Sequence, residues 1–300
     1  MKQILLSISL MLFILPLSAQ EIIFEGEKAF EIRQKTTCGT LEEGKTRYGV
    51  WYGKAYSRVP GEKDRHLFNV VGINIRQCDC VEDEVRGKGF RSVSREVMVY
   101  TDPETDQIMD SWENPFTGKE VEVIHVANDP VNMRAYAYEK DKQGKANSKT
   151  HIQKYGDVMV SSHEIPLFYE NPLGGEYQAY VGGAYHAMEI FNTYYIAEEI
   201  SNSEIRSLSQ SNISWARLSQ WLPWMGMGSK PGIMVFNATG FSTFDREKVP
   251  ARIIQVLSNR YPKYLTPPPK DDKRPNETSW TVFKKHLEGK EKEGVGTGRH

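Results

Sequence analysis

Short segments in which apolar and polar residues alternate run through most of this chain, and no other feature of the sequence constrains the fold as strongly. Those in the first half are 48–56, 67–76, 94–100, 108–112 and 121–126, and those in the second half are 150–155, 157–165, 177–197, 214–221 and 232–237. All are rich in β-branched and aromatic residues, and a period of two is typical of strands. The sequence therefore predicts a mainly β protein.

Turn-forming residues between these segments predict antiparallel pairing of neighbouring strands. The run 101–106 combines aspartate, proline and threonine and predicts a hairpin, and the run 114–118 predicts the next turn of a meander. A sheet of many strands has edges that can pair with other chains, and closure removes those edges. The predicted fold is an antiparallel, closed or nearly closed β-barrel of the calycin or lipocalin-like type.

Helical patterns are few. Residues 250–261 place Ile253, Ile254 and Leu257 at helical spacing after a proline that suits a first turn, so they predict one late helix. The segment 202–210 is a weaker helix or a turn, and the polar run 140–149 predicts an exposed loop. No glycine- and serine-rich linker and no repeat interrupts the chain before residue 266. We expect a single domain over 20–285 and a flexible charged tail over 286–300.

The first 19 residues have the pattern of a signal peptide. Lys2 precedes an apolar run that is too short to span a bilayer, and small residues end the run at Ser18 and Ala19. We expect cleavage after Ala19 and an exported protein, either periplasmic or secreted. No later stretch is long and apolar enough for a membrane helix.

Three cysteines follow the predicted leader, at Cys38, Cys78 and Cys80. An exported protein meets oxidising conditions, so Cys38 is expected to pair with either Cys78 or Cys80. The latter two are poor partners for each other, because residues two apart in an extended segment do not bridge easily. They have no second cysteine cluster to complete a zinc site, and the sequence predicts no metal and no cofactor.

The charge balance excludes two classes of partner. The formal net charge is −1, and removal of Lys2 with the leader makes it −2. A near-neutral protein without a basic stretch is not expected to bind nucleic acid or an anionic membrane surface.

The segment 214–221 holds the most unusual side chains. If it is a strand, Trp215, Arg217 and Trp221 share one face, and Trp224 follows shortly after. An arginine between two indoles forms either a buried ion pair or part of a pocket for an anionic or aromatic ligand. We therefore take the tryptophans and Arg217 as candidate ligand-binding residues.

Glu189 is the candidate partner of Arg217. In a strand over 177–197, Tyr185 and Glu189 share one face, so that the carboxylate lies among aromatic rings. Burial raises the pKa of such a carboxyl unless a cation is near, and Arg217 is the natural cation. Two alternatives are open: a structural ion pair that fixes the strand register, or a general acid or base with an arginine that holds a substrate anion.

Three histidines are further candidates for proton transfer: His125, His163 and His186. None lies in a zinc-protease pattern, because Pro166 follows His163 too closely for a helix. No Gly-x-Ser-x-Gly motif is present for a nucleophilic serine. Any one of these histidines alone is more often structural.

Asn128 and Asp129 precede Pro130 at the end of a predicted strand. This pattern usually makes a turn or a cap. The alternative is that both side chains lie at the mouth of the barrel and contact a ligand.

Several motifs resemble a known family. They are YTDPET at 100–105, WENPFTGKEV at 112–121, HVANDPV at 125–131, WLPWMGM at 221–227 and NETSW at 276–280. In this order they resemble the family known as domain of unknown function 1838, over about residues 30–285. The resemblance implies a single-domain protein, exported or cytoplasmic, of no settled activity.

Two hypotheses about function follow. In the first, an aromatic pocket with Glu189 and a histidine makes the protein a metal-free acid/base enzyme of the isomerase, cyclase or lyase type. In the second, the same pocket belongs to a carrier or binding protein for a small apolar or aromatic molecule. A structural envelope protein is a third option. An enzyme requires a convergent acid and base, whereas a carrier requires few inward-facing charges.

Overall fold

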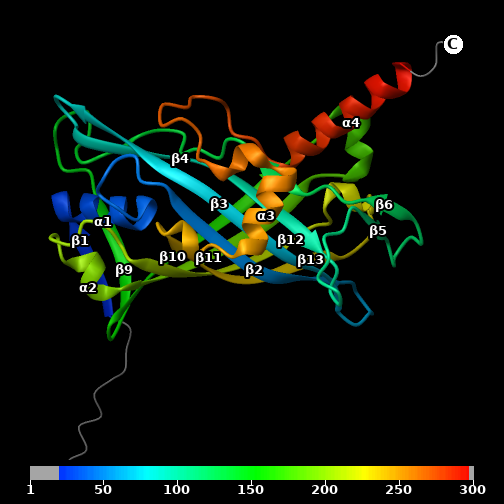
Figure 1. Cartoon of the computed structure of the whole chain (residues 1–300), viewed down its shortest axis with the longest axis horizontal. Coiled ribbons are helices and arrows are strands. Elements are labelled where there is room, and N and C mark those ends of the chain that lie inside the picture. The colour runs from blue at the N-terminus through cyan, green and yellow to red at the C-terminus, as the bar shows by residue number, and fades with distance from the viewer. Residues whose placement is uncertain (1–19, 297–300) are drawn as a thin grey trace, which may run out of the picture.

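A long antiparallel sheet dominates the computed structural model, which describes residues 20–296 and side chains as far as residue 289 (Figure 1). The strands are β1 (Gln20–Glu25), β2 (Arg47–Arg58), β3 (Arg65–Asp83), β4 (Gly87–Thr101), β5 (Ser111–Glu113), β6 (Glu120–Glu122), β7 (Val126–Asn128), β8 (Ala137–Tyr138), β9 (Lys149–Tyr155), β10 (Val158–Tyr169), β11 (Tyr185–Ile196), β12 (Gln210–Ser219) and β13 (Ile233–Thr243). The α-helices are α1 (Gly26–Cys38), α2 (Ala197–Ser201), α3 (Ala251–Arg260) and α4 (Ser279–Gly296). Short 3₁₀ helices are η1 (Gly175–Tyr180), η2 (Pro223–Met225), η3 (Arg246–Lys248) and η4 (Pro262–Leu265). The predicted leader 1–19, with its cleavage site, lies outside the described residues.

The strands pair in the order β1-β9-β10-β11-β12-β13-β2-β3-β4-β7, and β8 also pairs with β4. These 11 strands form one sheet, and β5 and β6 form a separate hairpin. In the part of the chain that the structure describes, no pairing joins β1 at one end to β7 or β8 at the other. The prediction of a mainly β, antiparallel fold with few helices is confirmed, and the prediction of a closed barrel is not.

The edge at β4 is protected without closure. Beyond β7, the chain continues along β4, where Val131 donates its backbone N–H to the Ser94 carbonyl over 2.7 Å and Met133 donates to the Ser92 carbonyl over 2.8 Å. These bonds occupy backbone groups that an open edge would expose. Covering coil thus replaces the strand-to-strand closure on which the barrel prediction was based.

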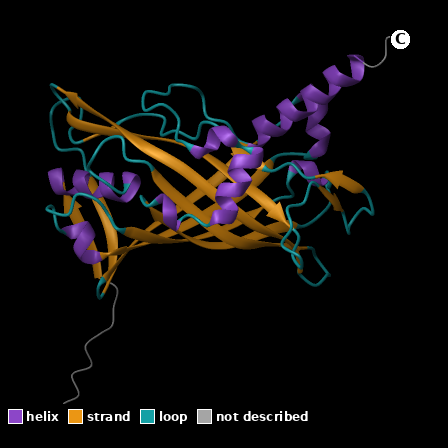
Figure 2. Cartoon of the chain, in the orientation of Figure 1, coloured by secondary structure: helices purple, strands orange, loops and turns teal. Residues whose placement is uncertain are grey.

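The sheet curls so that two walls face each other. Strands β2, β3 and β4 cross in front of β11, β12 and β13 (Figure 2). Tyr100 on β4 and Tyr185 on β11 belong to one hydrophobic cluster, although five strand-to-strand steps separate them in the sheet. In a flat sheet those steps span about 24 Å. We call the concave side of these strands the inner face.

The wall formed by β2–β4 is buried on both sides. Val70 belongs to the inner cluster, whereas Val71 and Ile73 pack on the outer face against Ile253 and Leu257 of α3. Two buried faces explain why apolar residues occupy successive positions of β3, such as Val70 and Val71. The predicted late helix is confirmed as α3, with the proline before it at the N-cap.

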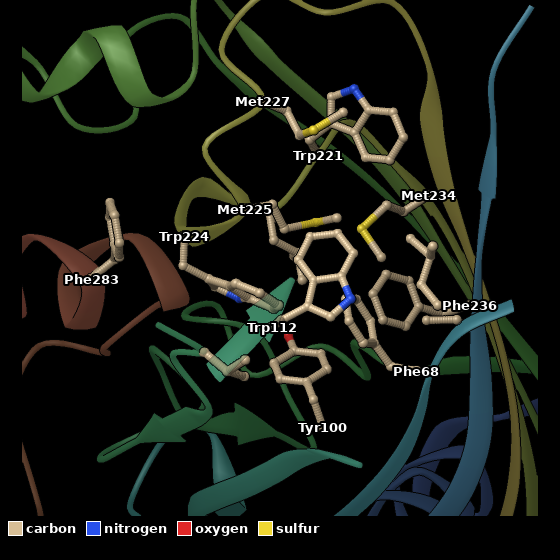
Figure 3. Packing of buried hydrophobic residues seen from close by; sticks show 14 of the residues in the cluster. Phe68, Tyr100, Trp112, Trp221, Trp224, Met225, Met227, Met234, Phe236 and Phe283 are labelled. Atoms are coloured by element: carbon tan, nitrogen blue, oxygen red, sulfur yellow. The ribbon is translucent and has the colours of Figure 1, made fainter. Parts of the chain in front are cut away.

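One end of the inner face is filled by aromatic rings, which we call the aromatic core (Figure 3). The ring of Phe68 lies 5.1 Å from that of Trp112 and 5.5 Å from that of Trp224, between centroids. Trp221 belongs to the same cluster, and its indole N–H donates to the Lys230 carbonyl over 2.9 Å. These two tryptophans of the 221–227 motif therefore pack in the core of the fold.

Helix α1 covers the opposite end and was not predicted from the sequence. A disulfide joins Cys38 at its last turn to Cys78 on β3, which is one of the two pairings left open. Lys35 is fully buried, and its ammonium donates to the carbonyl of Asn202 over 2.7 Å. The Tyr195 hydroxyl donates to the Thr36 carbonyl over 3.3 Å. Helix α1 is thus fixed to both walls.

Most predicted strands correspond to observed ones, with different boundaries. β3 and β4 are longer than predicted, and β12 ends at Ser219, so Trp221 lies beyond it. The predicted strand over 177–197 begins only at Tyr185, after η1. The predicted hairpin at 101–106 forms, since Met109 donates its backbone N–H to the Tyr100 carbonyl over 3.1 Å. Helix α4 occupies most of the segment that was predicted to be a flexible tail.

Candidate functional site

An ion pair lies on the inner face at the middle of the curled sheet. The register of β11 and β12 places Glu189 directly opposite Arg217. The Arg217 guanidinium donates from Nη1 to Glu189 Oε1 over 2.7 Å and from Nη2 to the Tyr185 hydroxyl over 2.8 Å. The sequence therefore paired the correct residues, and it placed Tyr185 and Glu189 correctly on one strand face.

Protein surrounds this ion pair, yet the pair stays accessible. Burial is the largest influence on the pKa of Arg217 and would lower it, but Tyr185 and Glu189 together hold the pKa above the ordinary range of arginine. Even so, 20% of the Arg217 side chain and 17% of the Glu189 side chain remain exposed. Accessible surface on an enclosed face is where a small molecule can reach charged groups.

Aromatic rings flank the ion pair. Trp215 lies two residues before Arg217 on β12, and its ring centroid is 6.3 Å from that of Phe191 and 5.7 Å from that of Phe236. Trp51 on β2 covers Gly72 of β3, where the methyl carbon of an alanine would stand 2.1 Å from the indole. Gly72 thus makes room for Trp51 on the inner face.

Three buried hydrogen-bond donors in this region have no acceptor among the described residues. They are the indole nitrogens of Trp51 and Trp215 and the Nε of Arg217. An unsatisfied buried donor costs about 1–3 kcal/mol. These donors are therefore available to an acceptor that the described chain does not supply.

A second carboxyl group reaches the site from the facing wall. Glu96 on β4 accepts a hydrogen bond from Asn128 Nδ2 over 2.8 Å. Burial raises the pKa of Glu96, Glu189 raises it further, and Arg76 and Arg217 oppose the increase. The curl of the sheet thus brings Glu96 into the electrostatic neighbourhood of Glu189 and Arg217.

The histidines do not join Glu189. His163 on β10 is the cross-strand neighbour of Phe191 on β11. Its side chain is exposed, and its Nε2 lies 3.1 Å from the Ser161 hydroxyl. His186 is exposed on the opposite face of β11, where its ring contacts that of Phe168 at 4.9 Å. In the described structure, neither histidine forms a hydrogen bond with Glu189. The geometry therefore does not support an acid and base pair between Glu189 and either of these two histidines.

His125 is buried beside the aromatic core. Its Nδ1 accepts a hydrogen bond from the Tyr100 backbone N–H over 3.2 Å, and its ring lies 5.9 Å from the Tyr100 ring. Burial lowers the pKa of His125 to about 4, and nearby Arg260 contributes while Asp110 opposes. A neutral, buried histidine that accepts a hydrogen bond from a backbone N–H is typical of a structural role.

Asp129 and Asn128 lie at the protected edge of β4. Asp129 forms ion pairs with Arg95 at 3.2 Å, Lys263 at 2.9 Å and Arg274 at 3.0 Å. Burial opposes the effect of these cations, but Arg274 and Lys263 hold the pKa of Asp129 below its usual value. Asp129 therefore links the C-terminal segment to the sheet, and Asn128 approaches the site only through Glu96.

Sequence reasoning missed Trp51, Glu96, Arg76 and Tyr100. Glu96 and Arg76 lie in strands that were predicted, and alternation alone places each on one of two faces. The proximity of Glu96 to Arg217 depends on the curl of the sheet, for which a single strand carries no signal. Trp51 had a detectable signal, since it is a large aromatic residue between two glycines two positions away on either side.

Two surface hollows lie away from this site. One of about 320 Å³ is bordered by Gly182, Trp221 and Lys230, and one of about 520 Å³ by Lys45 and Lys248. Within residues 20–296, no group of three His, Cys, Asp or Glu side chains is placed to hold a metal ion. No helix in that range is long and apolar enough to cross a membrane.

Comparison with known proteins identifies a family and no activity. The model of a family described as protein of unknown function (DUF1838) matches residues 44–287, which confirms the resemblance of the motifs. No curated protein matches the chain.

Among solved structures, the chain is similar to a LolA superfamily protein from Nitrosomonas europaea, with 6% identity, coverage of 77% of this chain and 97% of that one, and a TM-score of 0.19. It is also similar to Ail, the attachment invasion locus protein of Yersinia pestis, solved with the heparin analogue sucrose octasulfate. That match has 6% identity, covers 67% of this chain and 98% of Ail, and has a TM-score of 0.15. At these TM-scores neither likeness carries an argument about this chain.

Proposed function

The chain belongs to the DUF1838 family, and because the family has no known activity, we propose a function from the site itself: the protein binds a small molecule with an apolar or aromatic body. The ligand lies on the inner face against Trp51 and Trp215, with a polar group directed at Arg217. In this proposal α1 and the aromatic core close the two ends of the space between the facing walls.

One observation carries this proposal. The indole N–H groups of Trp51 and Trp215 and the Nε of Arg217 belong to residues of the inner face, are buried and lack an acceptor in the described chain. A ligand that combines a hydrogen-bond acceptor with an apolar body satisfies these donors and also covers the aromatic surfaces.

An exported location belongs to the same proposal. It rests on the signal-peptide pattern that ends at Ala19 and places the protein in the periplasm or outside the cell. The disulfide between Cys38 and Cys78 supports it, because disulfides persist in oxidising compartments.

Isothermal titration calorimetry with uncharged 1-decanol tests the proposal. We expect saturable binding to the wild type, and roughly tenfold weaker binding to Trp215→Leu because apolar contact and a donor are lost. Phe168→Leu is the matched control, since Phe168 is 61% exposed on the outer face and should bind 1-decanol like the wild type. Absence of binding to the wild type, or loss of binding only in Phe168→Leu, would refute the proposal.

A metal-free acid/base enzyme of the isomerase, cyclase or lyase type is the second candidate. The observation in its favour is that Glu96 and Glu189 approach the same space from facing walls in different environments. Burial raises the pKa of Glu96, which suits Glu96 to act as the acid, and Glu189, bonded to Arg217, is the candidate base. Glu96 replaces the histidine of the sequence-based hypothesis.

A comparison of retained compounds separates the two candidates. Small molecules would be extracted from wild-type and Glu189→Gln protein, both purified from the native host, and analysed by liquid chromatography and mass spectrometry. If the variant retains a compound that purified wild-type protein converts to another, the protein is an enzyme. If both retain the same compound and the wild type leaves it unchanged, the binding function stands.

A further inference from the structure

Two arginines lie opposite each other at the α1 end of the inner face. The register of β2 and β3 pairs Arg47 with Arg76, and both positions face the same side as Trp51. Like charges directly opposite on neighbouring strands are destabilising. A pair of this kind requires a compensating anion or strong acceptors nearby.

In the described part of the chain, no carboxylate forms an ion pair with either of these two arginines. Among the described residues, neither Arg47 nor Arg76 has an acidic group within 4.0 Å, although Glu96 exerts a more distant attraction on Arg76. Arg47 is only 4% exposed, so bulk water does not compensate its charge. Burial lowers the pKa of Arg47 to about 10, Arg76 contributes to the decrease, and Tyr195 opposes it.

The hydrogen bonds at the pair are incomplete. Arg47 Nη2 donates to the Ser211 hydroxyl over 2.7 Å, but Arg47 Nε is buried without an acceptor among residues 20–289. Arg76 donates to Asn74 Oδ1 over 2.8 Å and, over a long 3.4 Å, to the Thr37 carbonyl at the end of α1. These neutral acceptors satisfy part of the two guanidinium groups and leave their positive charge in place.

The interior as a whole carries more positive than negative charge. Between the aromatic core and α1, the inner face holds the arginines Arg47, Arg76 and Arg217 and the carboxyl groups of Glu96 and Glu189. Glu189 is already bonded to Arg217. An additional negative charge near the arginine pair therefore improves the charge balance of the enclosed space.

We propose that Arg47 and Arg76 form an oxyanion site that takes a carboxylate or phosphate-type head group at one end of the ligand, while the apolar body lies toward Trp51 and Trp215 and a second polar group reaches Arg217. This inference rests on the proposed function and specifies the class of ligand as an amphipathic anion. Four residues along β2 separate Arg47 from Trp51, about 13 Å in an extended strand. A chain of roughly ten carbons is a suitable probe for that span.

Decanoate and 1-decanol form the test pair, because they differ only in the charged head group. We expect calorimetry at neutral pH to show decanoate binding about tenfold or more tightly than 1-decanol, as charge-assisted hydrogen bonds are strong. In Arg47→Gln, and independently in Arg76→Gln, decanoate binding should weaken until this preference falls to within about twofold. Arg47→Lys keeps the charge and should retain most of the preference.

The outcomes separate the two proposals. If 1-decanol and decanoate both fail to bind the wild type, the proposed function itself fails. If both bind equally, or if decyltrimethylammonium binds more tightly than decanoate, the ligand is a neutral or cationic molecule and the oxyanion site is wrong. If one glutamine variant does not fold, as checked by circular dichroism, the other variant and Arg47→Lys decide. If the preference for decanoate over 1-decanol survives in every folded variant, the oxyanion site is also refuted. Competition between inorganic phosphate and decanoate would show that phosphate-type head groups fit the site.

Discussion

Glu189 and Arg217 are direct cross-strand neighbours on the inner face, joined by a hydrogen bond of 2.7 Å between Oε1 and Nη1. We propose two compatible roles for this pair. It fixes the register of β11 and β12, and its exposed fraction leaves Arg217 available to a ligand. A pair that served the register alone would not need the accessible surface.

The register role predicts strong coupling between the two residues. Arg217→Met leaves the Glu189 carboxylate enclosed without its cation, and we expect the free energy of unfolding to fall by about 2–3 kcal/mol. Adding Glu189→Gln removes the unpaired charge and should restore much of the loss. Urea denaturation of the wild type, both single variants and the double variant measures the coupling.

A solvent-exposed ion pair provides the control. Arg58 and Asp64 lie 2.8 Å apart, but 62% and 45% of their side chains are exposed. Arg58→Met should barely change the unfolding midpoint, because surface pairs contribute little. Equal effects at Arg58 and Arg217 would contradict the special environment assigned to Arg217.

Acid should destabilise the fold through His125. Its pKa is about 4 in the folded protein and 6.5 ordinarily, so the unfolded chain binds the proton more tightly. Neutral His125 contributes stability that is fully present above pH 6.5 and is lost as the pH falls toward 4, by up to about 3 kcal/mol. His125→Asn keeps an acceptor for the Tyr100 N–H and should flatten this dependence between pH 7 and 4.5.

The exposed His163 is the matched control for that experiment. Urea denaturation of His163→Asn at the same pH values should reproduce the slope of the wild type. The role assigned to His125 is wrong if His125→Asn keeps the full slope, or if His163→Asn removes it.

The disulfide should contribute strongly to stability. Cys38 and Cys78 are separated by 40 residues, and their bond constrains the unfolded chain while it fixes α1 to β3. Loss of such a loop closure costs about 3–4 kcal/mol, so the double variant with alanine at both positions should unfold at a clearly lower temperature. Cys80 is a free thiol, and Cys80→Ala should have a much smaller effect in the same thermal scan. A comparable decrease in both proteins would contradict this role of the disulfide.

Gly72 is required by the position of Trp51. An added methyl group would stand 2.1 Å from the indole, so Gly72→Ala must displace the ring. We expect a loss of about 1–3 kcal/mol in unfolding free energy and weaker binding of 1-decanol. Gly183→Ala, at a glycine with open space around it, should preserve both properties. Unchanged binding in Gly72→Ala would remove Trp51 from the site.

The sequence predicts those features that depend on one strand or on one adjacent pair. Alternation identified most strands of the sheet, and it placed Glu189 and Arg217 on faces that meet. Helix α1 was missed because its apolar residues Ala29, Phe30 and Ile32 make only a short stripe, and its place depends on the disulfide.

The rest of the site depends on the curl of the sheet. Glu96 comes into the electrostatic neighbourhood of Arg217 from a strand four steps away, and no local pattern specifies such proximity. Trp221 and Trp224 belong to the aromatic core because β12 ends at Ser219, before both residues, and the chain then turns through η2, which contains Trp224. The unusual composition of the segment 214–227 indicated its importance. Tertiary packing places Trp221 and Trp224 in the aromatic core and Trp215 and Arg217 at the candidate site.

The indole N–H resonances provide the most direct test of the binding function. The chain has six tryptophans, which single Trp→Phe variants would assign in ¹H–¹⁵N spectra of the labelled protein. On titration with 1-decanol, we expect the resonances of Trp51 and Trp215 to shift as their unpaired donors gain an acceptor, while that of Trp221, already bonded to the Lys230 carbonyl, stays in place. Shifts confined to Trp221, or no shift of Trp51 and Trp215 at saturating 1-decanol, would contradict a ligand site on the inner face.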